Sequence, residues 1–271
     1  MIEFQNVSLA YGLNTAAVTA VKNLNFTIQD GDFAAVIGAN GAGKTTAAKL
    51  MNGILKPTAG QVLVDGTPTA KLRTSELAKR IGFLFQNPDR QLCKPTIREE
   101  IAFGLELVGA KDIDKTVDGL LEEFGFPADR APFSMSRGER QRIALASLIA
   151  VAPQTLGLDE PTTGLDYREC MAILNRVKAL HKTGTTVIMV CHDMELVLDF
   201  ATRVLVFAGG ELLADGEPRK IFRDEDLLRR ASVLPPQITR LSARLSDLLP
   251  PTDTLEEMEK AIREKKGGAS R

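Results

Sequence analysis

The sequence has no excess of charge, no closely spaced cysteines and no hydrophobic run long enough to span a bilayer. Its 271 residues include 34 Lys and Arg against 35 Asp and Glu, which gives a formal net charge of −1. This balance provides no global field that would draw the chain to nucleic acid or to an anionic membrane. We therefore expect no nucleic-acid partner, and we expect any partner to be recognised through local features.

Cysteine is scarce, and the three thiols, Cys93, Cys170 and Cys191, lie far apart in the sequence. This spacing excludes a C-x-x-C metal or redox pair, and scattered thiols fit a reducing compartment better than a secreted disulfide framework. The first residues alternate like a strand and show no signal-peptide pattern. The longest largely apolar run, 143–152, has about half the length that a membrane-spanning helix needs. We expect that the chain does not cross a bilayer by itself.

The order of strand and helix patterns predicts an α/β fold. Residues 1–30 alternate like antiparallel strands, a second hairpin pattern follows at 61–68, and 33–37 reads as a strand buried on both faces. From 155 to 207, strand and helix patterns alternate, which indicates a parallel sheet with helices on its faces. Between these parts, 96–152 carries helical patterns and no strand signal. A helical insert is thus expected to interrupt the α/β core.

The composition changes near the end of the chain. After about Asp215, short charged helix patterns are broken by two Pro-Pro pairs. We predict a main domain over 1–216, whose helical part covers about 87–152, and a C-terminal helical extension over 217–271. The extension has an apolar helix face that could need a partner or could pack on the chain's own core. The residues of this face are Leu241, Leu245, Leu248 and Leu249.

Residues 38–45 carry the strongest functional motif. Gly38-Ala39-Asn40-Gly41-Ala42-Gly43-Lys44-Thr45 matches G-x-x-x-x-G-K-[ST] between a buried strand pattern and a helix pattern. Glycines let backbone N–H groups curl around phosphates, Lys44 supplies a mobile cation, and Thr45 offers a hydroxyl to Mg²⁺. A Gly-rich turn that binds nothing is the alternative, which the strand-loop-helix context disfavours. We expect nucleotide binding by this loop together with the adjacent Thr46.

Two carboxylates follow the next strand pattern along the same sheet edge. Asp159 and Glu160 end the strand predicted at 155–158, and ligands of an open parallel sheet bind beyond the carboxyl ends of its strands. Asp159 could hold Mg²⁺ through water, and Glu160 could act as the general base for an attacking water. A solvated acidic turn is the alternative. Gly157 interrupts the apolar run, which predicts a weaker strand.

For four further side chains, a functional and a structural interpretation must be weighed. His192 directly follows a strand pattern, where it could sense a terminal phosphate, whereas His181 ends a helix pattern, where a cation suits the helix dipole. We assign function to His192 and a structural role to His181. Gln86 closes another strand pattern and could orient water or metal, or be an ordinary loop residue. Tyr11 could stack on adenine or be an exposed hairpin aromatic.

The stretch Ser136-Arg137-Gly138-Glu139 opens a helix pattern and also has two readings. S-x-x-E before apolar residues is the capping-box pattern, in which the serine and the glutamate each satisfy a backbone N–H group. Ser136 and Gly138 at a helix N-terminus could also meet a phosphate through a hydroxyl and a close backbone. The stretch taken alone favours the cap, and the two readings are compatible.

These motifs in this order resemble the ATP-binding-cassette (ABC) ATPases over about 1–216. The resemblance implies a P-loop NTPase core with an antiparallel β subdomain, a helical signature subdomain and a small C-terminal helical extension. It implies adenine stacking by Tyr11 and an inter-subunit loop that ends at Asp166. The family's catalytic and metal-binding side chains correspond to Gln86, Asp159, Glu160 and His192.

The family's signature, L-S-G-G-Q followed by Q-R, resembles residues 135–139 with Gln141 and Arg142. In the family this segment meets nucleotide on the other subunit, which implies a head-to-tail pair with two ATPs between phosphate loop and signature. Arg137 and Glu139 depart from the pattern. Glu139 would add a like charge near phosphate, and Arg137 could offset it.

Within the family, the stretches FQNPDRQL, TIREEIAFGLEL and LPPQITRL resemble the energy-coupling-factor (ECF) transporter ATPases, although Arg90 stands where an acidic residue is usual. This resemblance implies ATP and Mg as cofactors and a homo- or heterodimer of ATPase subunits. It also implies a place at the cytoplasmic face of the cell membrane, with a transmembrane T component and a substrate-binding S component for vitamins, cobalt or nickel.

The expected activity is therefore ATP hydrolysis that energises import. A soluble ATPase of the same fold in DNA repair, chromosome maintenance or translation is the alternative. The near-zero net charge and the single phosphate loop disfavour it. A nonhydrolytic nucleotide-binding subunit is disfavoured because Glu160 and His192 are both present.

Overall fold

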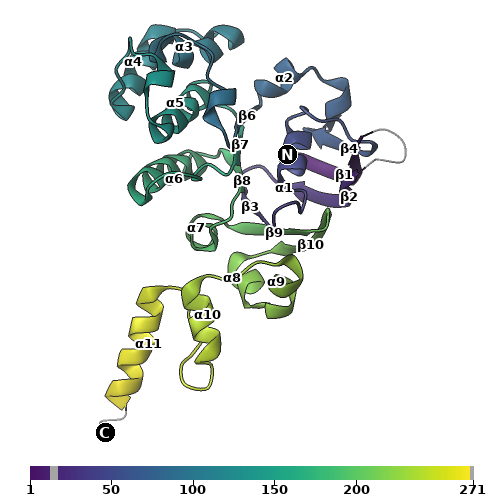
Figure 1. Cartoon of the computed structure of the whole chain (residues 1–271), viewed down its shortest axis with the longest axis vertical. Helices are drawn as coiled ribbons and strands as arrows, with labels where there is room; N and C mark the ends of the chain where they lie inside the picture. Colours follow the sequence, from purple (N-terminus) through teal and green to yellow (C-terminus); the bar gives the residue numbers. More distant parts are fainter. Residues whose placement is uncertain (13–17, 269–271) are drawn as a thin grey trace.

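The computed structural model describes residues 1–12 and 18–268, so 269–271 of the predicted extension lie outside the described residues. The larger of its two sheets contains β3 (Phe33–Ile37), β6 (Ile81–Leu84), β7 (Thr155–Asp159), β8 (Thr186–Val190), β9 (Arg203–Ala208) and β10 (Glu211–Gly216). The strand order is β10-β9-β3-β8-β7-β6 (Figure 1). Neighbours from β9 to β6 pair in parallel, and β10 pairs antiparallel with β9. The predicted α/β class is confirmed.

A smaller antiparallel sheet lies beside the larger one. It consists of β1 (Ile2–Tyr11), β2 (Val18–Ile28), β4 (Ala59–Val64) and β5 (Thr67–Pro68), in the order β2-β1-β4-β5. The alternation at 1–30 and the hairpin pattern at 61–68 correspond to its two hairpins. Helix α1 (Lys44–Met51) lies between the two sheets (Figure 1) and buries Leu50 and Met51 with them.

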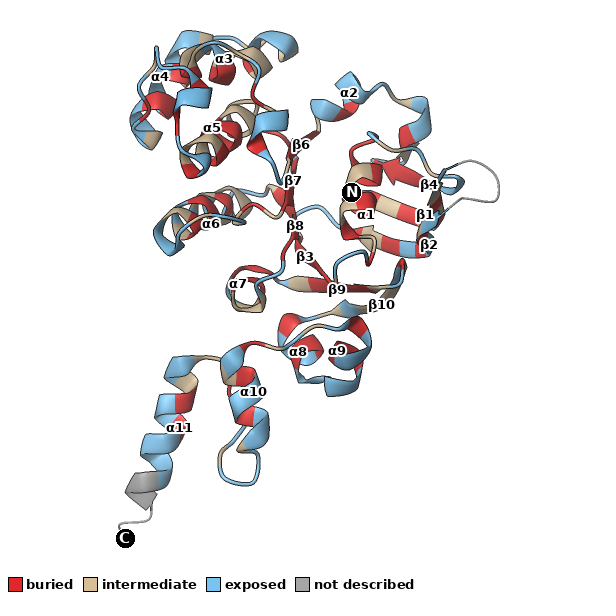
Figure 2. Ribbon diagram, viewed as in Figure 1, coloured by how far each residue is buried: buried red, intermediate tan, exposed pale blue. Residues whose placement is uncertain are grey.

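Strand β3 separates two hydrophobic clusters. Successive side chains of a strand point to opposite faces. Ala34 and Val36 join the cluster formed with α1 and the small sheet, whereas Phe33, Ala35 and Ile37 join the cluster under the helices of the other face. Figure 2 shows the buried residues gathered on the central strands and on the helix faces turned toward them. Since both faces of β3 are buried, the loop that follows it has a fixed starting point.

Helices cover the second face of the large sheet and its β6 end. α6 (Tyr167–Lys182) and α7 (Met194–Phe200) cover the face, while α3 (Ile97–Val108), α4 (Ile113–Phe124) and α5 (Arg137–Ala150) gather at the β6 end (Figure 1). The short α2 (Thr74–Ala78) lies on the side of the small sheet. Among residues 1–12 and 18–268, no helix is both long and apolar enough to span a membrane.

Gly157 in β7 has a packing reason. A Cβ atom at this position would lie 2.7 Å from Cδ2 of Phe83 on the neighbouring β6, so the phenyl ring fills the space that a side chain would need. β7 pairs with a strand on each side and is buried along its whole length. The strand weakness predicted from this glycine is therefore offset by Phe83.

The C-terminal segment divides into two pairs of helices. α8 (Pro218–Arg223) and α9 (Glu225–Ala231) bury Ile221, Phe222 and Leu228 in the same cluster as the large sheet. α10 (Gln237–Arg244) and α11 (Leu255–Gly268) project away from it (Figure 1). The buried carboxylate of Asp253 ties them back, because it pairs with the guanidinium groups of Arg219 and Arg223 on α8.

The apolar face predicted in this segment is shorter than expected. α10 ends at Arg244, so of the four leucines only Leu241 lies on it. Leu241 and Leu248 are exposed, and Leu245 and Leu249 are half-buried. These leucines therefore do not pack into the chain's own core.

We expect two truncated chains to show that the two pairs of helices contribute differently to folding. A chain that ends after Val233 keeps α8 and α9 and should retain its fold, whereas a chain that ends after Asp215 should unfold or aggregate. The second cut removes four large buried side chains, Ile221, Phe222, Leu227 and Leu228, each contributing about 1.5–3 kcal/mol, from a total stability of about 5–15 kcal/mol. Circular dichroism during heating measures both. Cooperative melting of the shorter chain near the full-length temperature would contradict the assignment of α8 and α9 to the core.

Candidate nucleotide site

The phosphate loop between β3 and α1 needs glycine where other strands approach its backbone. A Cβ atom at Gly38 would lie 2.2 Å from the carbonyl oxygen of Phe207 on β9. At Gly43, which has φ +99°, a Cβ atom would lie 2.6 Å from the carbonyl oxygen of Ala20 on β2. The loop is thus held between β9 and β2 with its backbone close to both, and only glycine fits at these two positions.

Lys44 begins α1, and its side chain turns back over the loop. Its Nζ atom donates hydrogen bonds of 2.9 Å to the carbonyl oxygens of Gly38 and Ala39. The residue is buried, and this burial lowers the pKa of the Lys44 ammonium group from its usual value. An anion beside this group would favour its charged form. The first turn of α1 carries no acidic residue, so its N-terminal potential is available to a phosphate as well.

The carboxylate of Asp159 lies against the hydroxyl of Thr45. Thr45 Oγ1 donates to Asp159 Oδ1 over 3.1 Å. Asp159 is only 3% exposed, and burial raises the pKa of its carboxyl group, with the Thr45 hydrogen bond opposing the shift. A buried carboxylate and a hydroxyl are oxygen ligands of the kind that Mg²⁺ prefers. The residues present therefore fit a magnesium ion.

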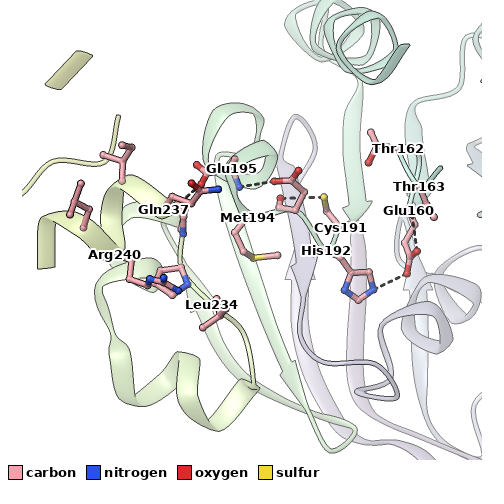
Figure 3. Close-up of a pocket in the computed structure, with 15 residues that line it drawn as sticks. Glu160, Thr162, Thr163, Cys191, His192, Met194, Glu195, Leu234, Gln237 and Arg240 are labelled. Carbon is pink, nitrogen blue, oxygen red and sulfur yellow. Dashed lines mark hydrogen bonds and ion pairs between the residues drawn. The ribbon is translucent and has the colours of Figure 1, made fainter. Parts of the chain in front are cut away.

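The Glu160 carboxylate, which follows β7, contacts side chains that follow the two neighbouring strands, β6 and β8. Its carboxylate accepts 2.7 Å and 3.0 Å hydrogen bonds from Gln86 Nε2 and Thr163 Oγ1, both on Oε2, and its Oε1 lies 2.8 Å from Nε2 of His192. Gln86 follows β6, Glu160 follows β7, and His192 follows β8. The His192 ring points toward Glu160 in Figure 3. The parallel sheet thus brings together side chains that the sequence analysis placed on one edge.

Thr163 was missed in the sequence analysis. Its hydroxyl reaches Glu160 because the chain turns directly after β7, with the Thr163 N–H group bonded to the carbonyl oxygen of Glu160. The signal that could have shown it is a hydroxyl residue three positions after a catalytic carboxylate in a Pro- and Gly-containing turn.

A cavity of about 300 Å³ connects the phosphate loop with the side chains of Glu160 and His192. It extends from Val18 to Ala20 on β2, along 40–46 of the phosphate loop, to Glu160 and His192. Tyr11 lies next to the loop, because its hydroxyl is 3.3 Å from Oγ1 of Thr46, and its ring is partly exposed. Residues 40–46 of the phosphate loop and two of the predicted catalytic residues, Glu160 and His192, therefore face the same space, whereas Gln86 does not line it.

The stretch from Ser136 to Glu139 forms the capping box at the start of α5. Ser136 Oγ accepts from the Glu139 N–H group over 3.2 Å, and a Glu139 carboxylate oxygen accepts from the Ser136 N–H group over 2.8 Å. The hydrogen bond from the Ser136 N–H group lowers the pKa of Glu139. Among the described residues, the cavity at the phosphate loop is not lined by 136–139. The negative charge of Glu139 is directed at its own helix terminus.

Two contacts join the start of α5 to the loop before α6. A Cβ atom at Gly138 would lie 2.2 Å from Oε1 of Glu169, so the helix termini touch at this glycine. A Cβ atom at Gly164 would lie 3.3 Å from Nε of Arg137, so the guanidinium group rests on the loop. The sequence analysis expected the charge of Arg137 to offset that of Glu139. In the structure, the Arg137 guanidinium group rests on the loop, whereas the Glu139 carboxylate belongs to the capping box.

The second histidine has structural contacts. His181 Nδ1 lies 3.2 Å from the carbonyl oxygen of Thr185, and the ring packs edge-on against Phe33 with centroids 5.4 Å apart. His181 therefore joins the end of α6 to the strand before the phosphate loop, at the edge opposite the cavity.

Comparison with known proteins identifies the family. The ABC transporter family matches residues 21–163. The chain is 41% identical over 251 residues to the energy-coupling factor transporter ATP-binding protein EcfA of Methanothermobacter thermautotrophicus, covering 90% of this chain and 80% of that protein. The chain belongs to the ABC transporter ATPases. Some other relatives are longer, and the chain spans 38% to 43% of their length.

Solved structures agree with this membership. The ABC ATPase superposes on cbiO1 from Clostridium perfringens, described as part of the ABC transporter complex cbiONQ, with a TM-score of 0.72 and 30% identity over 91% of this chain and 98% of that one. It also superposes on a dimeric ATP-binding cassette in a post-hydrolysis state bound to ADP and Pi, with a TM-score of 0.73 and 28% identity over 80% of this chain and 99% of that one. The ABC ATPase therefore has the fold of an ATP-hydrolysing enzyme.

We expect Glu160→Gln to slow ATP hydrolysis by about a hundredfold or more, because the amide cannot take a proton from water. The shape is preserved, so nucleotide binding should persist. Phosphate release and nucleotide titration measure the two effects. Lys44→Ala is the matched variant that should lose binding, since its cation contacts phosphate before reaction. Near-normal turnover of Glu160→Gln would assign the base to another residue.

Proposed function

We propose that this ABC ATPase binds MgATP at 38–46, hydrolyses it with Glu160 as general base, and energises a membrane transporter of the ECF type. The observation that carries the proposal is the cavity shared by the phosphate loop, Glu160 and His192. A loop that only bound nucleotide would not need a carboxylate held by three donors beside it. Binding and hydrolysis are therefore proposed for one site.

The magnesium ion is assigned to the polar groups around Asp159. Thr45 would hold it through the hydroxyl and Asp159 through water, with the amide oxygen of Gln86 as a further ligand. Bound there, the ion would supply positive charge that offsets the negative charge developing on the phosphate group. Gln86 donates its amide nitrogen to Glu160, which leaves the amide oxygen to face a cation.

Glu160 becomes available as a base when one of its donors leaves. Both carboxylate oxygens are engaged, Oε1 by His192 and Oε2 by Gln86 and Thr163. His192 would turn to the γ-phosphate, so that Oε1 accepts a proton from water instead. Thr163 keeps the carboxylate oriented throughout, because it lies in the same turn. Tyr11 is proposed to stack on the adenine from its position beside Thr46.

The signature residues Ser136 to Glu139 are proposed to act on ATP of a partner subunit. They do not line the cavity of their own chain among the described residues, and a helix N-terminus attracts phosphate. Ser136 Oγ accepts the capping bond through a lone pair, which leaves its O–H free to donate. Asp166 would lie in the loop between the subunits. A relative of the same fold is dimeric.

Membrane partners follow from the relatives' names. EcfA is named as an energy-coupling factor transporter ATP-binding protein, and cbiO1 as part of a transporter complex. We therefore propose a transmembrane T component and a substrate-binding S component as partners, with vitamins or transition-metal ions as imported solutes. The ATPase would then lie at the cytoplasmic face of the cell membrane. The soluble ATPase of DNA repair or translation is not favoured by these relatives.

Copurification from membranes tests the transport role. A tagged chain solubilised in mild detergent should retain integral membrane proteins in a fixed ratio, and Glu160→Gln should retain them while solute uptake stops. The relevant measurements are mass spectrometry of the complex and uptake by vesicles that contain it. Recovery of DNA-repair or ribosomal proteins with no integral membrane protein would contradict the proposal in favour of the soluble alternative.

Mixing two inactive variants tests the composite site. Lys44→Ala damages the phosphate loop and Ser136→Arg damages the signature, so each homodimer has two damaged sites. A mixed dimer has one site with both lesions and one with neither, and random mixing should restore about a quarter of the normal rate if the sites act independently. Ser136 is the better target because Gly138→Asp would collide with Glu169 of its own chain.

The readout of this experiment is steady-state hydrolysis at several mixing ratios. Ser136→Arg alone should still bind ATP, since its Lys44 is intact. Mixed dimers that form and bind ATP without any recovered hydrolysis would contradict two independent composite sites.

A further inference from the structure

A groove of about 920 Å³ begins at the catalytic edge and extends beyond the groups used by the chemistry above. It runs from Glu160 and His192 past Met194 on α7 to the segment that leads into α10 (Figure 3). Its far wall is largely apolar and also carries Gln237 and Arg240. The apolar residues of this wall are Leu234, Pro235, Pro236, Ile238 and Leu241.

This wall is held firmly although it is exposed. Leu234 is 68% exposed. The N–H group of Gln237 donates a 2.6 Å hydrogen bond to Glu195 on α7, which joins α10 to the helix that follows His192. The buried carboxylate of Asp253 pairs with the guanidinium group of Arg223 on α8, and this ion pair also fixes the segment that contains α10. The groove is therefore preformed, so an occupant that fills it loses little free energy to rearrangement.

Tyr167 is an exposed aromatic residue at the turn that follows β7, next to the signature segment. It is 78% exposed and is the first residue of α6. Asp166 caps that helix through a 2.8 Å hydrogen bond from the Glu169 N–H group, and Glu169 touches Gly138. The ring therefore starts from a rigid backbone beside the signature segment. Such a tyrosine loses little conformational entropy on burial and is typical of interface anchors.

We propose that Tyr167 of a second copy of this chain inserts into the groove and anchors the ATPase pair on the C-terminal segment. The proposal rests on the head-to-tail pairing proposed above. Tyr167 adjoins the signature through the contact of Glu169 with Gly138, and the groove adjoins His192 and Glu160. When the signature of one subunit meets the nucleotide of the other, Tyr167 of the first subunit comes to lie opposite the groove of the second.

Charge and symmetry favour the same occupant. The groove is lined by two acidic side chains, Asp193 and Glu195, against one basic side chain, Arg240, and the exposed Arg168 that follows Tyr167 would meet this net negative charge. A two-fold pair makes the contact twice, because each subunit supplies both a tyrosine and a groove. A membrane partner is a less suitable occupant, because the groove opens on the edge that the second ATPase subunit covers.

Cross-linking between differently tagged chains tests the contact. One chain carries Tyr167→Cys and the other Leu234→Cys, both with Cys93→Ser to remove the exposed native thiol. With a nonhydrolysable ATP analogue and Mg²⁺, mild oxidation should give a covalent mixed dimer, because a disulfide needs Cα atoms within about 7 Å. The control pair replaces Leu234→Cys with Leu248→Cys, which is exposed but outside the groove.

Two results would overturn the proposal in different ways. Dimers detected by sedimentation with no cross-link above the Leu248→Cys control would refute the anchor and leave the proposed ATPase pair intact. If the chain forms no dimer with the analogue and Mg²⁺, self-pairing itself fails, and the anchor fails with it.

Substitution of the tyrosine gives a second test. In the Glu160→Gln background with MgATP, Tyr167→Ala should weaken dimerisation by about a hundredfold to ten-thousandfold, as expected for loss of two buried aromatics, one at each of the two contacts. Tyr167→Phe should stay within about threefold of the parent because the ring fills the groove. Leu107→Ala removes another exposed apolar residue, on α3, and should change nothing. An unchanged Tyr167→Ala dimer, or an equal loss in Leu107→Ala, would refute the anchor.

Discussion

Burial of β3 on both faces is the constraint on which the nucleotide site depends. Alternate side chains of Phe33–Ile37 enter two different hydrophobic clusters, so a shift by one residue would exchange the two faces. The register of β3 is therefore strongly fixed, and with it the starting point of the phosphate loop. Close contacts at Gly38 and Gly43 then hold the loop between β9 and β2.

The same burial sets the electrostatics of the site. Burial lowers the pKa of Lys44 and raises the pKa of Asp159, so each group lies where its charge is disfavoured. A phosphate beside the ammonium group and a cation beside the carboxylate would favour both charged forms. The proposed MgATP ligand would provide both charges together and so offset the cost of placing these groups in a buried position at the end of a sheet.

The capping residues of the signature segment are the same residues for which an intersubunit role is proposed. The Glu139 carboxylate is engaged by the capping box at the α5 terminus, and Arg137 rests on Gly164, so both departures from the family pattern have contacts within their own chain. Ser136 keeps a hydroxyl proton to donate. The contact of Gly138 with Glu169 also ties the signature to the start of α6, so the two elements present one rigid face.

The sequence by itself determined the elements and the motif positions, because these depend on local periodicity and on residues close in the chain. The apolar run of β3, the Gly-rich loop before Lys44 and the strand-helix alternation from 155 to 207 were all predictable in this way. The convergence of Gln86, Glu160 and His192 was also predictable, since the carboxyl ends of parallel strands share one edge. Strand register and strand order came only from the structure.

Tertiary structure decided the contacts between residues distant in sequence. Packing of Phe83 over Gly157, burial of α8 and α9 in the main core, and the exposed leucines beyond α10 have no local signature. The groove beside His192 likewise depends on how the C-terminal segment packs on α7. Such contacts depend on the relative placement of elements, which side-chain volume and close packing fix in three dimensions and periodicity does not encode.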